Sequence, residues 1–209
     1  MATMAELSWQ VNGFTRDGKR GLRIRVTSRP RPIEKLLGNK RAYYNHFMNW
    51  LKKAGEYAFI DLYIDSEGGS VHSACGMVRA LAMQGLKGKD VRILINGRCD
   101  SAATLLLKLY APVYITETGS VYIHMPSRVR YVKSGDGYRE KETSRHGMET
   151  TAGMFEGAYL HRMKRNGEKF GKKSGIRALM EKGHRFGARE AVAAGLCDGI
   201  MSRETFDRG

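Results

Sequence analysis

Three apolar segments in the middle of the chain each run into a residue type that can carry out chemistry, and their order constrains the fold. Each segment is short enough to be one buried strand, and helical periodicity fills the stretches between them. This alternation predicts β-α-β units and a mainly parallel sheet. Because the carboxyl ends of parallel strands meet at one edge of a sheet, we expect the residues after the three segments to converge there. The segments and the residues that follow them are 59–64 with Gly68 and Gly69, 91–95 with Ser101, and 120–123 with His124.

The remaining pattern completes an α/β fold. Residues 22–26 alternate with period two and predict a half-exposed strand, which we expect the prolines in 29–32 to end. The polar residues 1–20 predict an N-terminal arm, either mobile or a peripheral hairpin, ahead of a single domain over 21–209. The charged stretch 128–145 predicts a hairpin or a loop. Apolar periodicity predicts helices at 40–54, 71–85 after the cap Ser70, 101–109, 148–163, 174–181, and 188–194 with Gly195 as its stop.

Charge and cysteine content bear on partners and compartment. The net charge is +15 at pH 7, yet no zinc-finger spacing, helix-turn-helix pattern or aromatic RNA-binding signature accompanies it. We therefore expect a solvated basic rim or a surface for an acidic partner, rather than specific nucleic-acid binding. The chain shows no apolar run of about 18 residues and no signal peptide, so no membrane contact is expected. Cys75, Cys99 and Cys197 lack metal-ligand spacing and fit a reducing compartment, so we predict a cytoplasmic protein without metal or cofactor.

Ser101, His124 and the glycine pair together offer the parts of a serine hydrolase. Hydrolysis by a serine needs a hydroxyl, a base, a group that orients the base, and donors for the oxyanion. Ser101 opens a helix after a strand, His124 ends a strand, and the N–H groups of Gly69 and Ala102 would be the donors. Each feature alone has a structural interpretation as a helix cap, a histidine at a sheet rim or a plain turn. Their order, each at a strand end, favours the catalytic interpretation.

Four motifs in this order resemble the proteolytic subunit of the Clp protease, over roughly residues 40 to 201. Residues 176–180 followed by Phe186 resemble most the phage-encoded branch, whose members act as head-maturation proteases. The motifs are the glycine pair in 64–71 (Ile-Asp-Ser-Glu-Gly-Gly-Ser-Val), the serine turn in 97–103 (Gly-Arg-Cys-Asp-Ser-Ala-Ala), the histidine in 122–126 (Tyr-Ile-His-Met-Pro) and the segment 189–200 (Arg-Glu-Ala-Val-Ala-Ala-Gly-Leu-Cys-Asp-Gly-Ile).

The resemblance implies a ClpP/crotonase-like fold of stacked β-α-β units with a projecting C-terminal helix at about 148–165, which relatives use to assemble rings. It implies Ser101 as nucleophile, His124 as general base, and Gly69 and Ala102 as the oxyanion hole. It also implies a polypeptide substrate, a homo-oligomeric ring, and an AAA+ unfoldase or a phage scaffold or capsid protein as possible partners.

The sequence departs from the family at three places. Ungapped alignment puts Gly183 where the family has its third catalytic residue, an acid; Glu181 is the alternative if the segment shifts locally. Cys99 and Asp100 replace two alanines, and Asp100 either faces the site or points to solvent. A basic stretch over 127–145 replaces the glycine-rich strand that pairs with substrate.

These observations favour a serine endopeptidase of Clp type that cleaves polypeptides through an acyl-enzyme on Ser101. A catalytically impaired structural or adaptor subunit is the first alternative, and Gly183 is its best support. A crotonase-type acyl-CoA enzyme shares the fold but needs neither Ser101 nor His124. A serine-lysine dyad would need a lysine beside Ser101, and Lys108 lies farther along the same predicted helix.

Overall fold

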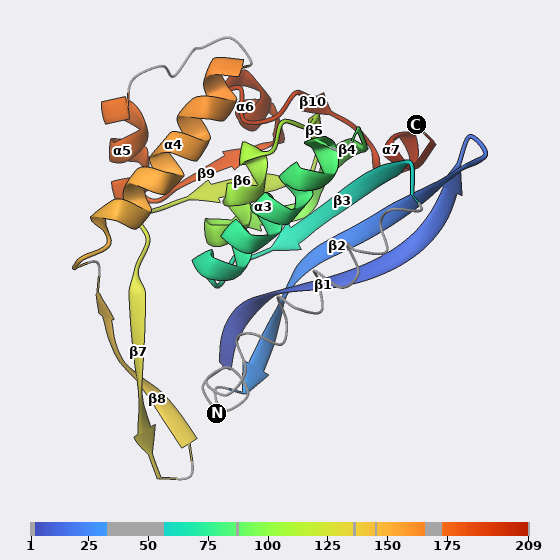
Figure 1. Cartoon of the computed structure of the whole chain (residues 1–209). Coiled ribbons are helices and arrows are strands. Elements are labelled where there is room, and N and C mark those ends of the chain that lie inside the picture. Colours follow the sequence, from blue (N-terminus) through green and yellow to red (C-terminus); the bar gives the residue numbers. More distant parts are fainter. Residues whose placement is uncertain are drawn as a thin grey trace.

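The computed structural model describes residues 3–32, 57–86, 88–135, 137–144, 146–165 and 173–208 (Figure 1). The helix predicted at 40–54 lies outside these residues. The helices and strands are β1 (Thr3–Arg16), β2 (Lys19–Pro32), β3 (Phe59–Ser66), α3 (Val71–Leu86), β4 (Asp90–Asp100), the 3₁₀ helix η2 (Ser101–Lys108), β5 (Val113–Ile115), β6 (Ser120–Ile123), β7 (Arg128–Ser134), β8 (Gly137–Ser144), α4 (Glu149–Arg165), α5 (Lys173–Lys182), β9 (His184–Gly187), α6 (Ala188–Ala193), β10 (Gly199–Ile200) and α7 (Arg203–Arg208).

The sheet is mixed but mainly parallel, as predicted. Within the described residues it has eight strands in the order β1-β2-β3-β4-β5-β10, and β6 pairs with both β4 and β9. Strands β2 to β6 and β10 pair in parallel, while β1 and β9 are antiparallel to their neighbours. Strand β4 forks the sheet, because Ile93–Ile95 pair with β5 and Arg98–Asp100 pair with β6. The branch through β6 carries His124 to the edge where β4 ends.

Alternation along the strands builds the core. Side chains at every second position of β2 and β3 are fully or almost fully buried, and they pack with α3, η2 and α4 in one cluster. Burying a leucine or isoleucine stabilises the fold by about 1.5–3 kcal/mol. The strand ends that carry the candidate site are therefore fixed to a rigid layer. Representative core residues are Leu22, Ile24, Val26, Ile60, Leu62, Ile64, Met77 and Leu81.

The N-terminal segment forms a long antiparallel hairpin of β1 and β2, so residues 3–20 adopt the hairpin rather than the mobile alternative. The boundary between an arm and a domain at residue 21 stays a prediction. The prolines in 29–32 were expected to end this strand, and the last residue of β2 is Pro32, although the strand includes both prolines. Proline has no backbone N–H to donate, so it is tolerated where a strand has only one neighbour. Strand β2 pairs with β3 only as far as Thr27, and among the described residues its two prolines pair with β1 alone.

Residues 128–144 form the predicted hairpin, β7–β8, which extends away from the sheet at the lower left of Figure 1. It begins four residues after His124. Helix α4 follows it and packs its buried side, which includes Phe155 and Tyr159, against the core.

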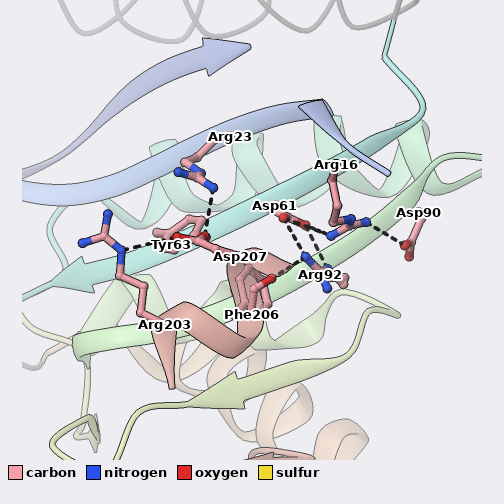
Figure 2. A network of polar contacts seen from close by, with 9 residues as sticks. All are labelled: Arg16, Arg23, Asp61, Tyr63, Asp90, Arg92, Arg203, Phe206 and Asp207. Atoms are coloured by element: carbon pink, nitrogen blue, oxygen red, sulfur yellow. Dashed lines mark hydrogen bonds and ion pairs between the residues drawn. The ribbon is translucent and has the colours of Figure 1, made fainter. Parts of the chain in front are cut away.

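Helix α7 covers the opposite face of the sheet. Phe206 packs with Tyr63 and Leu94. The residues on either side of Tyr63 and Leu94 in their strands belong to the main core. Because successive residues of a strand face opposite sides of the sheet, Phe206 lies on the face away from that core. Asp61 is fully buried beneath α7 and is held by arginines of two strands (Figure 2). Arg92 Nε and Nη2 donate to its two carboxylate oxygens at 3.0 and 2.8 Å, and Arg16 Nη1 donates at 3.3 Å. Arg92 also donates to the Phe206 carbonyl at 2.9 Å, which ties α7 to the sheet.

Asp61→Asn is expected to lower the free energy of unfolding by about 3 kcal/mol, because buried guanidinium groups lose their counter-charge. Burial raises the pKa of Asp61 to about 7, and the positive charges of Arg16 and Arg23 oppose that rise. Urea unfolding monitored by circular dichroism measures the loss.

Asp90→Asn is the matched control. Its carboxylate is 61% exposed and lies 3.7 Å from Arg16 Nη2, so the expected loss is about 0.5 kcal/mol or less. Equal losses in the two variants would contradict the importance of the buried ion pairs that Asp61 makes with Arg16 and Arg92.

Candidate active site

Strand register brings the three sequence motifs to one edge of the sheet. Ser66 at the end of β3 pairs with Cys99 of β4, and Asp100 at the end of β4 pairs with Tyr122 of β6. Three adjacent parallel strands therefore end at nearly the same height in the sheet, and they are followed by the glycine pair, Ser101 and His124. This confirms the predicted convergence.

Ser101 occupies a strained turn between β4 and η2. Its φ is +53°, a left-handed value that costs an L-residue about 1 kcal/mol or more and persists only where the surroundings enforce it. The helix that follows is 3₁₀ rather than α, with Leu109 N–H bonded to the Leu106 carbonyl at 3.2 Å. The sequence pattern did not distinguish the two, because the segment is apolar on nearly all sides.

A hydrogen-bond relay from α4 supports this turn from behind. The Thr104 hydroxyl donates to the Ser101 carbonyl at 2.5 Å, so the Tyr159 hydroxyl, 2.7 Å away, is the donor to Thr104. Tyr159 is fully buried, and burial raises its pKa, so it stays protonated as a donor. The conformation of the turn therefore depends on the position in which α4 packs against η2.

The glycine pair lies directly against the serine turn. Gly68 and Gly69 have φ values of +96° and +137°, which favour glycine. A Cβ on Gly68 would lie 2.6 Å from the Asp100 carbonyl oxygen, 2.7 Å from Ser101 Cβ and 2.9 Å from Ala102 N. The Gly68 N–H donates to Ser66 Oγ at 3.1 Å. Ser70 then caps α3 as predicted, with its Oγ accepting from Ser73 N–H at 3.3 Å.

His124 follows β6 with its ring in a defined setting. Its Nδ1 lies 2.8 Å from the Met125 carbonyl oxygen, and its ring stacks on that of Tyr122 with centroids 5.2 Å apart and an interplanar angle of 21°. The Met125 N–H donates to the Met180 carbonyl at 2.9 Å, which ties this segment to α5.

Gly183 lies across from His124, because Ile123 of β6 pairs with His184 of β9. Its φ is +71°, and a Cβ there would lie 2.5 Å from the Tyr122 hydroxyl oxygen. The alternative acid, Glu181, is exposed and accepts from Arg177 Nε at 3.3 Å. His184 bonds to Glu190 at 2.8 Å.

Asp100 does not point to solvent, which was one of the two expectations for it. It is 5% exposed and accepts two hydrogen bonds of 3.0 Å from Arg185, so its charge is paired within the fold. The Arg185 guanidinium lies 4.8 Å from the centroid of the Tyr122 ring. The sequence analysis missed Tyr122 and Arg185. The alternation in Tyr-Ile-His, which puts Tyr122 and His124 on one face of the strand, was the available signal.

Cys99 and Cys197 are not candidate nucleophiles. Cys99, two residues before Ser101, and Cys197 are buried, and burial raises the pKa of Cys99 well above its ordinary value and that of Cys197 to about 12. A thiol needs to be ionised to attack, and these stay protonated at neutral pH. Among the described residues, no cluster of three or more His, Cys, Asp or Glu side chains could hold a metal. The helices of the described ranges are all too short or too polar to cross a membrane.

Parallel β-α-β units that bring a glycine pair, a serine turn and a histidine to one sheet edge define the ClpP-like class of α/β proteins. The model of the Clp protease family matches residues 39–204, and the chain belongs to that family, a family of peptidases. No curated protein matches the chain.

Proposed function

We propose that this chain is a serine endopeptidase that cleaves polypeptides through an acyl-enzyme on Ser101. The observation that carries the proposal is the contact of Gly68 with the strained Ser101 turn, beside the strand end that bears His124. In this assignment His124 is the general base, and the N–H groups of Gly69 and Ala102 bind the oxyanion.

The mechanism follows from the charges that develop. Ser101 Oγ attacks the scissile carbonyl carbon while His124 Nε2 takes its proton, and the new negative oxygen is stabilised by the two N–H groups. As the carbon–nitrogen bond breaks, His124 returns the proton to the leaving amine. A water molecule, deprotonated by the same nitrogen, then attacks the ester carbon, and His124 passes that proton to Ser101 Oγ as the carbon–oxygen bond breaks.

A fluorophosphonate probe tests this assignment, because it forms a covalent bond only with an activated serine. We expect an adduct on Ser101, located by mass spectrometry, and no adduct at this position in Ser101→Ala. In His124→Ala the labelling rate should fall by about 10³-fold or more. Ser127→Ala, which changes an exposed serine close to His124 in the chain, is the control and should label as the native chain does.

The catalytically impaired subunit is the second candidate, and Gly183 is the observation in its favour. Absence of labelling in the assembled native chain would establish it over the peptidase. We also propose, from family membership, a homo-oligomeric ring in the cytoplasm. An AAA+ unfoldase or a phage scaffold or capsid protein is the proposed partner, and the phage-type branch the proposed subclass.

A further inference from the structure

The chain next to His124 fixes a proton on one nitrogen of its ring. A carbonyl oxygen has no proton to give, so the 2.8 Å contact between Nδ1 and the Met125 carbonyl requires a proton on Nδ1. In the neutral ring the lone pair then lies on Nε2, the nitrogen that must accept a proton from Ser101. A base also needs its ring plane fixed, and one face of the ring is covered by Tyr122.

Tyr122 fills the space that a side chain at position 183 would enter. The hydroxyl oxygen of Tyr122 lies 2.5 Å from a Cβ built on Gly183, and Gly183 has a left-handed backbone. A residue with a side chain at 183 therefore clashes with Tyr122 in its present place. The large side chain of Tyr122 in β6 therefore fits only because position 183, immediately before β9, is a glycine.

Tyr122 is itself fixed by groups connected to the nucleophile. The Arg185 guanidinium packs on its ring, donates to Ser120 Oγ at 2.9 Å, and holds Asp100 through two hydrogen bonds of 3.0 Å. Asp100 immediately precedes Ser101. A continuous set of contacts thus runs from the serine turn through Asp100, Arg185 and Tyr122 to the His124 ring.

We propose that Tyr122 is a positioning residue for His124, with its ring fixing the imidazole plane while the Met125 carbonyl holds the Nδ1 proton. The inference rests on the proposed function and extends it to the group that orients the base. It assigns the stacked ring, rather than the tyrosine hydroxyl, as the part that acts.

Two substitutions separate ring from hydroxyl. Tyr122→Phe keeps the ring and should label with the probe within about threefold of the native rate. Tyr122→Leu removes the stack, and the maximal labelling rate should fall about 10- to 100-fold with the half-saturating probe concentration unchanged, because only the geometry of the base is lost. Tyr110→Leu, which changes an 82% exposed tyrosine, is the matched control and should label normally. Tyr122→Trp supplies another aromatic ring, so its labelling rate should lie between those of Tyr122→Leu and the native chain.

Nitrogen NMR of the imidazole measures which ring nitrogen carries the proton, and it needs no turnover. The His124 signals are identified by their loss in His124→Asn. We expect the Nδ1–H tautomer in the native chain and in Tyr122→Phe, and a mixture with the Nε2–H tautomer in Tyr122→Leu. An Nε2–H tautomer in the native chain overturns the inference, as does a Tyr122→Leu variant with native tautomer and native rate. A native chain that shows the expected tautomers but is not labelled contradicts the proposed function alone.

Discussion

Gly68→Ala is expected to lower the labelling rate of Ser101 by about 100-fold or more, and the free energy of unfolding by about 2–4 kcal/mol. The new methyl group would lie 2.6–2.9 Å from Asp100, Ser101 and Ala102 atoms that belong to the backbone or lie next to it, so no side-chain rotation relieves the overlap. The loop must move away from the serine turn, and the N–H of Gly69 moves with it. Probe kinetics and urea unfolding measure the two effects.

Gly88→Ala separates backbone strain from steric overlap. Gly88 has a similarly left-handed φ of +78°, but nothing lies within 4 Å of a Cβ built on it. We expect this control to lose about 1 kcal/mol of stability and to keep its labelling rate. If Gly68→Ala labelled Ser101 at the native rate, the contact between the glycine pair and the serine turn would have no part in activity.

Arg162→Met is expected to lower the free energy of unfolding by about 3–5 kcal/mol, the largest effect on stability that we predict. Arg162 is fully buried in α4. It donates to the carbonyls of Ala111 and Leu196, each at 3.1 Å, and to the Asp198 carboxylate. Methionine fills much of the volume but donates nothing, so the buried carbonyls of Ala111 and Leu196 lose a donor and the partly exposed Asp198 carboxylate loses its ion pair.

Lys164→Met changes an exposed residue on the same helix, and its stability should stay within about 0.5 kcal/mol of the native value. Arg162→Lys keeps the charge but not the planar fork, so we expect an intermediate loss. Chemical unfolding of the three variants ranks them. A native-like Arg162→Met would show that α4 is held by apolar packing alone.

Local pattern predicted the secondary structure well where periodicity and caps agree. The helix after Ser70 and the stop at Gly195 were placed correctly, since a cap and a left-handed glycine are encoded within a few residues. The end of β4 was not. Apolar periodicity stops at Ile95, but the strand continues to Asp100 because β6 supplies a second partner. That partner is a tertiary contact, and a local pattern does not report it.

The candidate site divides in the same way. Ser101, His124 and the glycine pair could be found because their order along the chain matches the order of adjacent strands. Alternation along the strand puts Tyr122 on the same face as His124, but the contacts of Arg185 with Tyr122 and Asp100 could not be found, because they depend on the register between β6 and β9, which lie about 60 residues apart. The ungapped alignment put Gly183 at the position of the family's third catalytic residue, and the register places Gly183 across from His124.

The pairing of β6 with β9 also sets an order of events during synthesis. A ribosome releases the glycine pair, Ser101 and His124 well before residues 184–187, which form the second neighbour of β6. Until then β6 is an open edge, and Tyr122 lacks Gly183 and Arg185 opposite it. Contacts across such sequence separations form late. A growing chain that has emerged only as far as α4 thus holds Ser101 and His124 without the strand that lies opposite Tyr122.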